Sequence, residues 1–194
     1  MDRRPGQRAG LTRVRVLAAA HELLGAEGVD GLTMRALARR LEVAPNALYS
    51  HVPGKTALLD AVIDEVLAQV EVPAMDVADP VTGLHALMCS TYDVLLGHPD
   101  LVPLYLARNG ARGANARHLG DVMLALLDRA GLREARAREA LSVLIVYTIG
   151  FAAFTTGPPI DVPDPEPRAE QMRENFDSGL RWLLAGITAP SMRA

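Results

Sequence analysis

The sequence of 194 residues contains little cysteine, lysine or aromatic character. Its one cysteine, Cys89, excludes a disulfide framework within the chain and any metal site with several cysteines. Aromatic residues make up 4% of the chain and β-branched segments are scarce, which favours an all-α fold. The first 17 residues lack the apolar segment of a signal peptide, so we expect a cytoplasmic protein.

The net charge of −3 conceals an uneven distribution. Residues 1–55 carry nine basic and five acidic side chains, and the only lysine, Lys55, is among them. The remainder carries 11 basic and 18 acidic side chains. A basic segment on an acidic body indicates that one end of the protein meets a polyanion. Arg3, Arg4 and Arg8 form a basic arm, which we expect to be disordered and to add weak electrostatic attraction.

Apolar residues recur with helical spacing over most of the chain. The spacing predicts two domains, residues 1–70 and 71–194, joined by a helix over 55–70. In the first domain an arm (1–11) precedes helices over 12–27, from Thr33, from Pro45 to about His51, and over 55–70. The second domain has predicted helices over 81–97, after Pro99, over 115–131, 133–156 and 169–187, with a proline-rich loop over 157–168.

Residues 140–160 carry no charge. A segment of this length could span a membrane. The segment before them is amphipathic, polar threonines interrupt them, and no aromatic belt flanks them. We therefore predict a helix buried on nearly all sides, in a core or in a subunit interface, and no membrane contact.

Two short helices joined by a three-residue break have the spacing of a helix-turn-helix. Leu48 would anchor the second helix, leaving small or polar groups, Pro45, Asn46, Ala47 and Ser50, for the major groove. Tyr49 and His51 can donate to phosphate oxygens, Lys55 can neutralise a phosphate, and Arg35 can reach a guanine edge.

The segment "LTMRALARRLEVAPNALYSHVPGKTALLDAV" (32–62) resembles the DNA-binding domain of the TetR family of transcriptional regulators. The resemblance covers about residues 12–66. It implies a DNA-facing set of Thr33, Arg35, Pro45, Asn46, Ala47, Tyr49, His51 and Lys55. Two positions depart from the family's pattern. Glu42 stands where many members have a turn glycine, and Ala44 stands where many have a polar capping residue.

The rest of the chain is similar to the tetracycline-repressor-like C-terminal domain, through "LLGHPDLVPLYLARNG", "YTIGFAAF" and "FDSGLRWLLAGI". The resemblance implies ligand binding and a homodimer whose interface combines the 140–156 helix and the last helix with their copies. Tyr105 stands where those repressors have a magnesium-binding histidine, and Phe154 stands near their acidic partner. We therefore predict neither tetracycline nor a metal or other cofactor.

Several residues of the second domain have helical spacing and adaptable side chains, which suit an effector pocket and an ordinary core equally well. With Tyr105, the candidate pocket residues are Met88, Tyr92, Leu95, Met123, Leu127, Tyr147 and Phe151. His85, His98 and His118 match no metal-site spacing. Enzyme motifs are absent, and we expect the acidic residues between Asp161 and Glu166 to be solvated rather than catalytic.

These features predict a homodimeric, ligand-responsive regulator that binds a palindromic duplex operator. We expect repression, with release by a small apolar molecule. An activator of the same fold remains an alternative. So does a dimeric module that binds a small molecule or a protein and contacts DNA weakly.

Overall fold

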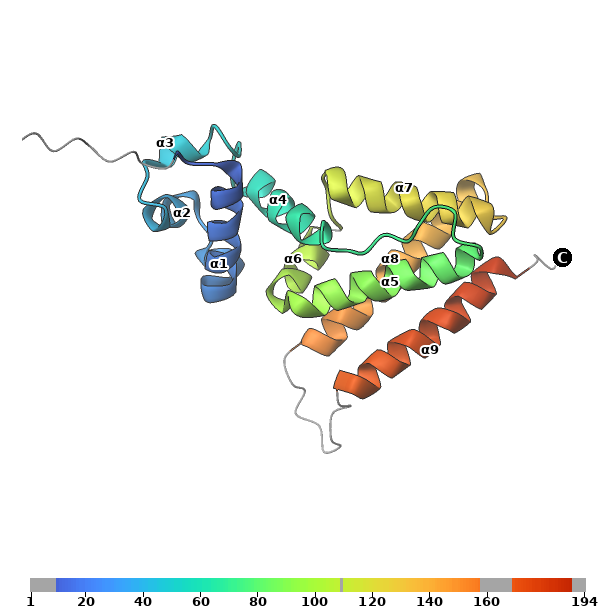
Figure 1. The fold of residues 1–194 in the computed structure, drawn as a ribbon. Coiled ribbons are helices and arrows are strands. Elements are labelled where there is room, and N and C mark those ends of the chain that lie inside the picture. The colour runs from blue at the N-terminus through green and yellow to red at the C-terminus, as the bar shows by residue number, and fades with distance from the viewer. Residues whose placement is uncertain (1–9, 109, 158–168, 190–194) are drawn as a thin grey trace, which may run out of the picture. The chain divides into compact units, whose positions relative to one another are not determined.

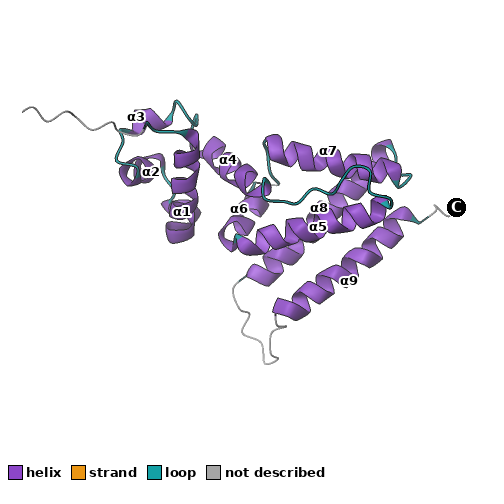
Figure 2. Cartoon of the chain, viewed as in Figure 1, coloured by secondary structure: helices purple, strands orange, loops and turns teal. Residues whose placement is uncertain are grey.

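The computed structural model describes residues 10–108, 110–157 and 169–189. Within these ranges every regular element is a helix, so the all-α prediction is confirmed (Figures 1 and 2). The chain divides into two compact units, one ending at Glu65 and one beginning at Val66. The predicted arm over 1–11 and the loop over 157–168 lie almost entirely outside the described residues.

The first unit contains α1 (Arg13–Gly31), α2 (Met34–Arg40), α3 (Pro45–Leu48) and most of α4 (Lys55–Leu67). Helix α1 begins after Thr12, whose hydroxyl accepts a hydrogen bond from the backbone N–H of Arg15. Gly28 has a φ of 69°, which interrupts the helix where the sequence predicts a stop, but a further turn follows it. The core of the unit consists of side chains from all four helices: Val16, Ala20, Leu23, Leu24, Leu37, Leu48, Leu58 and Val62.

Helix α4 ends at Leu67, three residues before the predicted end at residue 70. The next residues have hydrogen bonds of the 3-10 type. The N–H groups of Gln69 and Val70 donate to the carbonyls of Val66 and Leu67, three residues back. Val70 is nevertheless buried, which explains why its place in the apolar pattern resembled helix. The predicted domain border after residue 70 remains a proposal.

The second unit begins with the end of α4 and continues with α5 (Pro80–Gly97). It then contains a 3-10 turn η1 (Pro99–Leu101), α6 (Val102–Ala107), α7 (Ala114–Arg129), α8 (Glu134–Thr156) and α9 (Ala169–Thr188). Helix α5 packs against α7, α8 and α9, and α8 also packs against α6, α7 and α9 (Figure 1). Met172, Phe176, Leu180 and Leu184 follow one another at four-residue intervals along α9 and form its buried stripe.

Local signals in the sequence account for the ends of these helices. The carboxylate of Asp79 accepts hydrogen bonds from the N–H groups of Val81 and Thr82, and Pro80 occupies the first helical position of α5. At the end of α7, Gly131 adopts a φ of 89°. Leu132 then donates to Leu127 and Gly131 to Asp128, which is the Schellman arrangement that glycine favours.

Helix α8 departs from its prediction. It is long and apolar enough to cross a membrane, but only 28% of its most apolar window is buried. Val143, Val146 and Phe154 are exposed, and Val146 keeps 69% of its surface accessible. Burial on nearly all sides is therefore wrong for the single chain, because α5, α7 and α9 cover only part of the helix. The subunit-interface alternative stays a prediction.

Candidate functional site

The turn between α2 and α3 has a defined hydrogen-bond pattern. Val43 donates to the carbonyl of Ala38 at 3.0 Å and Glu42 donates to Arg39 at 3.2 Å, which forms a Schellman motif at the end of α2. Glu42 occupies its left-handed position with a φ of 55°. The structure therefore uses a glutamate where the backbone favours glycine. The glutamate at position 42 therefore keeps the geometry of the turn, but it makes the turn less stable than a glycine would.

The two helices begin with caps of different strength. The Thr33 hydroxyl accepts a hydrogen bond from the Ala36 N–H at 3.0 Å, as the sequence predicts for the start of α2. Ala44, the cap of α3, makes no side-chain hydrogen bond, and Pro45 follows it at the first helical position. Proline has no N–H to satisfy there, so it offsets part of the missing cap.

Helix α3 is shorter than predicted. The α-helical part ends at Leu48, and residues 49–51 continue as turns. Tyr49 donates to the Asn46 carbonyl at 3.3 Å, and His51 donates to that of Leu48 at 2.9 Å. Leu48 is fully buried, as the predicted anchor requires. The predicted rod from Pro45 to His51 is thus one α-helical turn followed by a turn of tighter geometry.

The predicted DNA-facing residues lie close together along the chain but differ in accessibility. Six are exposed: Thr33, Arg35, Pro45, Asn46, Tyr49 and Ser50. Ala47, His51 and Lys55 are half-buried. Tyr49 keeps 52% of its surface accessible, which is unusual for a tyrosine that only packs. The Ser50 hydroxyl donates to the Ala47 carbonyl at 2.8 Å.

Lys55, Arg40 and Arg13 of the first unit have hydrogen-bond partners within the protein. Lys55 donates from Nζ to the Val29 carbonyl at 2.7 Å, so part of its donor capacity serves the fold rather than a phosphate. Arg40 pairs with Glu22 at 2.6 Å. Arg13 donates to the carbonyl of His51 at 2.6 Å, a contact that the sequence analysis missed. In the sequence Arg13 stands out only as one of the basic residues of the N-terminal segment, and this does not indicate which residue it contacts in the fold.

A cavity of about 330 Å³ lies among helices of the second unit. Three of the predicted pocket residues, Met88, Tyr105 and Met123, line it. Other lining residues from the two long helices were not predicted: Thr91 from α5, and Ser142, Ile145, Val146, Thr148 and Ile149 from α8. Burial raises the pKa of the Tyr105 hydroxyl, and a hydrogen bond from the backbone of Ala111 acts in the opposite direction.

Five predicted pocket residues do not line this cavity. Leu95 and Leu127 are fully packed in the core. The rings of Tyr92, Tyr147 and Phe151 belong to an aromatic cluster around Phe176 of α9. Tyr92 stacks on Phe176 with the ring centroids 4.0 Å apart, and its hydroxyl lies 2.8 Å from the Thr155 hydroxyl. Tyr147 and Phe151 are half-buried and Tyr92 lines a second cavity, so the role of these residues in effector binding stays a prediction.

The histidines of the second unit have separate environments. His98 lies 3.2 Å from the Gln69 side-chain oxygen, and His118 is exposed on α7. His85 lies beside Cys89 and Asp177. Phe154, the counterpart of an acidic residue in the resemblance, keeps 65% of its surface accessible and does not line the cavity.

Comparison with known families accounts for this arrangement. Residues 16–62 match the family described as bacterial regulatory proteins of the tetR family. Residues 78–173 match the tetracyclin repressor-like C-terminal domain. The first match contains the whole of α2, α3 and the turn between them. The chain belongs to the TetR family.

Curated TetR-family relatives are transcriptional regulators. An HTH-type transcriptional regulator from Saccharopolyspora erythraea is 35% identical over 140 residues, 72% of this chain and 59% of the relative. The HTH-type transcriptional repressor DrrR1 from Streptomyces coeruleorubidus is 34% identical over 154 residues, 77% of this chain and 56% of the relative. The matched part of this chain thus spans less than three fifths of these two relatives.

Solved TetR-family structures cover nearly the whole chain. Apo ActR from Streptomyces coelicolor matches with a TM-score of 0.80 at 25% identity, over 93% of this chain and 96% of ActR. BioQ with its double-stranded DNA operator matches with a TM-score of 0.70 at 30% identity, over 93% and 99%. TetR-Q116A from Acinetobacter baumannii AYE in complex with minocycline matches with a TM-score of 0.75 at 30% identity, over 91% and 96%.

Proposed function

We propose that this TetR-family protein is a homodimeric repressor that binds a palindromic DNA operator and is released by a small, largely apolar molecule. The observation that carries the proposal is the exposed face of the α2–turn–α3 segment, held in place by the fully buried Leu48. A regulator and a repressor among the relatives, and BioQ crystallised with its operator, support it.

The operator contacts divide by chemistry. Pro45, Asn46, Ala47 and Ser50 present small or polar groups to the major groove, and Arg35 is long enough to bind a guanine edge. Tyr49, His51 and Thr33 donate to phosphate oxygens. Lys55 has three donors, of which one binds Val29, so two remain for a phosphate.

Exposed apolar side chains on α8 and α9 support a homodimer. Val143, Val146 and Phe154 lie along one side of α8, and Trp182 of α9 keeps 77% of its surface accessible. A monomer rarely leaves such a surface to water. The two copies of α8 and α9 would cover these faces, and the same burial accounts for the apolar length of α8 without a membrane. A two-fold axis then places two recognition segments about 34–36 Å apart, one helical repeat of DNA.

The 330 Å³ cavity is the proposed effector site. Met88, Met123 and Ile149 favour an apolar body. The Tyr105 hydroxyl can bond to a polar group of the effector, and the Thr91 hydroxyl, which donates to the Leu87 carbonyl at 2.8 Å, can accept one hydrogen bond. Leu67, the last residue of α4, also lines the cavity. Because α4 starts at Lys55, one helix contains both a proposed operator contact and a wall of the effector site. We propose α4 as the transmitter, with a coupling of about 1–3 kcal/mol per site.

No catalytic role is part of this proposal, because the curated relatives are regulators. We place the protein in the cytoplasm, where its DNA target is found. Repression rather than activation is supported by the names of several relatives, which include DrrR1 and tetracycline repressor proteins.

Selection of bound sequences from a random duplex pool tests the proposal. We expect a palindrome whose half-sites have the spacing given above. Arg35→Ala and Tyr49→Ala should each weaken binding to the selected sequence by about tenfold or more, as loss of about 1–3 kcal/mol implies. Arg117→Ala, which removes an exposed arginine from α7, is the matched control and should bind normally. Failure to enrich any sequence would contradict operator binding.

A further inference from the structure

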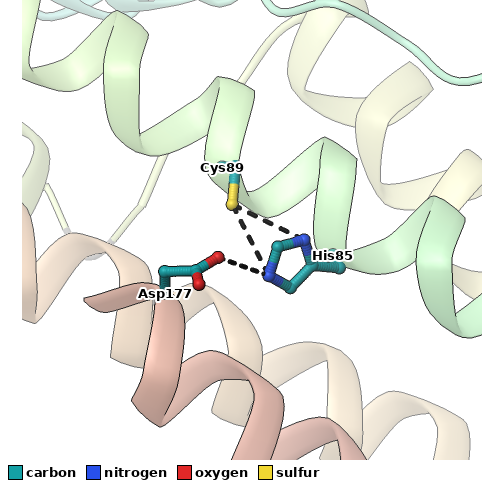
Figure 3. Close-up of side chains that lie close together, drawn as sticks. All are labelled: His85, Cys89 and Asp177. Atoms are coloured by element: carbon teal, nitrogen blue, oxygen red, sulfur yellow. Dashed lines mark hydrogen bonds and ion pairs between the residues drawn. The ribbon is translucent and has the colours of Figure 1, made fainter. Parts of the chain in front are cut away.

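Helices α5 and α9 bring together a histidine, a cysteine and an aspartate that lie far apart in the sequence. His85 and Cys89 are four residues apart on α5 and therefore share one face of that helix. Asp177 of α9 faces them (Figure 3). One potential ligand atom from each residue lies within 4.8 Å of the others, and all three side chains are half-buried. From this juxtaposition we propose a binding site for a zinc-like divalent metal ion, formed by His85, Cys89 and Asp177.

The distances fit this proposal after small rotations of the side chains. Nε2 of His85 lies 2.8 Å from Oδ1 of Asp177 and 3.9 Å from Sγ of Cys89. Tetrahedral zinc has bonds of about 2.0–2.3 Å to nitrogen, oxygen and sulfur, so its ligand atoms lie about 3.3–3.6 Å apart. The nitrogen–oxygen pair must therefore open by about half an ångström, and the nitrogen–sulfur pair must close by less. The sulfur–oxygen pair lies within 4.8 Å, so it must close by at most about 1.2 Å.

The types of ligand restrict the metal. Thiolate and imidazole favour Zn²⁺ and neighbouring transition metals over Mg²⁺ or Ca²⁺, which prefer oxygen. On binding, the Cys89 thiol loses its proton to solvent and the imidazole binds through unprotonated Nε2. The thiolate and the Asp177 carboxylate then contribute two negative charges, which match the charge of the ion.

The surroundings provide orientation and access. Arg181 lies 3.0 Å from Oδ2 of Asp177, so it occupies the oxygen that does not face His85 and fixes the direction of Oδ1. Arg173, the other nearby cation, pairs with both carboxylate oxygens of Asp93. A cavity of about 230 Å³ is lined by Cys89 and Asp177, which leaves room for water or another ligand in the fourth position.

The effector cavity does not contain these three residues, so the metal site is separate from it. It also needs no DNA contact, because both helices belong to the second unit. A bound ion would join α5 to α9 and stabilise their packing. The spacing of His85 and Cys89 was visible in the sequence, but the third ligand comes from a helix more than 80 residues away.

Cobalt titration of the reduced, metal-free full chain tests the proposal. We expect one Co²⁺ per chain, with a sulfur-to-cobalt charge-transfer band that Zn²⁺ abolishes by displacement. Cys89→Ser should remove the band. His85→Gln and Asp177→Asn should each weaken binding by at least about tenfold, since even partners outside the coordination shell contribute about 10–100-fold. His118→Gln, an exposed histidine on α7, should bind cobalt as the wild type does.

The shift of the melting temperature on addition of Zn²⁺ also tests variants that are less stable than the wild type. Zn²⁺ should raise the melting temperature of the wild type and of His118→Gln, and should leave that of Cys89→Ser unchanged. Two results would overturn the proposal. One is cobalt binding without a thiolate band. The other is a band that persists at unchanged affinity in His85→Gln and Asp177→Asn, which would indicate capture by the thiol alone.

Discussion

Lys55 donates a hydrogen bond from Nζ to the carbonyl oxygen of Val29, 2.7 Å away. The bond joins the first residue of α4 to the last turn of α1. Carbonyl groups at the end of a helix carry partial negative charge, so a lysine there is favourable. The only lysine of the chain is thus a structural contact within the DNA-binding unit and, in our proposal, a phosphate contact as well.

Replacing Lys55 by methionine separates these two roles. Methionine keeps the apolar stem but removes the ammonium group. We expect the free energy of unfolding to fall by about 1–2 kcal/mol, because a hydrogen bond to a charged group is lost at a half-buried site. We also expect the slope of the logarithm of operator affinity against that of salt concentration to fall by about one, the value for one phosphate contact.

Urea denaturation and fluorescence anisotropy at several salt concentrations provide the two measurements. Arg117→Met, from an exposed position on α7, is the control and should change neither quantity. If the stability falls while the salt slope stays constant, Lys55 only positions α4 and the phosphate contact is wrong.

Glu42 has a left-handed backbone conformation, with a φ of 55°. This conformation lowers the stability of the folded unit. Such a conformation costs an L-residue about 1–2 kcal/mol, whereas glycine adopts it freely but loses about 0.5–1 kcal/mol of conformational entropy. We therefore expect Glu42→Gly to raise the free energy of unfolding by up to about 1 kcal/mol.

The opposite change is Glu42→Val, which places a β-branched residue where it is most strained. We expect it to destabilise the unit by about 1 kcal/mol or more. Urea denaturation of both variants measures the difference. Equal stability of the glycine and valine variants would contradict the backbone explanation.

The sequence predicted the helices where local chemistry decides the structure. The cap of α2 at Thr33 was predicted correctly. Helix α5 was predicted from residue 81, and it begins one residue earlier, at Pro80, after the Asp79 cap. The predicted end of α3 near His51 was wrong, because the N–H groups of Tyr49 and His51 donate to carbonyls only three residues back, although Val52 still donates to the Leu48 carbonyl four residues back. Helical periodicity does not distinguish such turns from α-helix.

The residues of the proposed sites were likewise predictable only in part. Spacing predicted which face of α7 is buried, but it could not show that Met123 lines a cavity while Leu127, one turn later, lies in the packed core. Whether a residue on the buried face of a helix lines a cavity or packs in the core depends on which neighbouring helices contact that turn. The approach of Asp177 to His85 has the same origin, since only the packing of α9 on α5 brings them together.

A charge on the exposed face of α8 tests the proposed dimer. Val146→Glu places a carboxylate on this apolar face, where dimer formation would bury it without a partner. We expect the dimer dissociation constant to rise by at least about 30-fold, as a penalty of 2 kcal/mol or more implies. Leu106→Glu, which changes an exposed leucine on α6, is the control and should leave the dimer intact.

Sedimentation velocity over a range of concentrations measures both variants. Circular dichroism confirms that they remain helical. A wild-type protein that sediments as a monomer at all concentrations, or a Val146→Glu variant as dimeric as the wild type, would contradict the assignment of this face.

Tyr147 predicts a stability change at alkaline pH. Burial of its ring raises its pKa to about 12, and the electrostatic effects of Tyr92, Asp177 and Cys89 act in the same direction. A tyrosine in an unfolded chain ionises near pH 10. Between about pH 10 and pH 12 unfolding therefore releases a proton, and the free energy of unfolding falls as the pH rises.

Urea denaturation across this pH range measures the slope. Tyr147→Phe should make the slope shallower, because the variant has no group to ionise at this position. Tyr105, whose pKa is also raised by burial, should keep part of the decline. Tyr49→Phe, which changes an exposed tyrosine of the other unit, should retain the wild-type slope. An unchanged slope in Tyr147→Phe would show that the decline has another source.

Gly179 of α9 lies directly beneath the hydroxyl of Tyr147, which donates to the Phe176 carbonyl at 2.9 Å. A methyl group at position 179 would overlap this hydroxyl and displace it from its acceptor. Alanine normally stabilises a helix by about 1 kcal/mol relative to glycine. Here we expect Gly179→Ala to destabilise the protein by about 1 kcal/mol instead, because the steric overlap and the lost hydrogen bond exceed that gain.

The double variant Tyr147→Phe, Gly179→Ala isolates the cause. Once the hydroxyl is absent, the nearest ring carbon lies 3.2 Å from the added methyl and must shift slightly. The alanine should then change the stability by about 0 to +1 kcal/mol relative to Tyr147→Phe alone. Gly120→Ala, on α7 with open space around the added methyl, should be stabilising in the wild-type background. Urea denaturation of the four proteins of the cycle gives the coupling between the two positions. A coupling near zero would show that the close approach of α8 and α9 at this point does not depend on the absence of a side chain at 179.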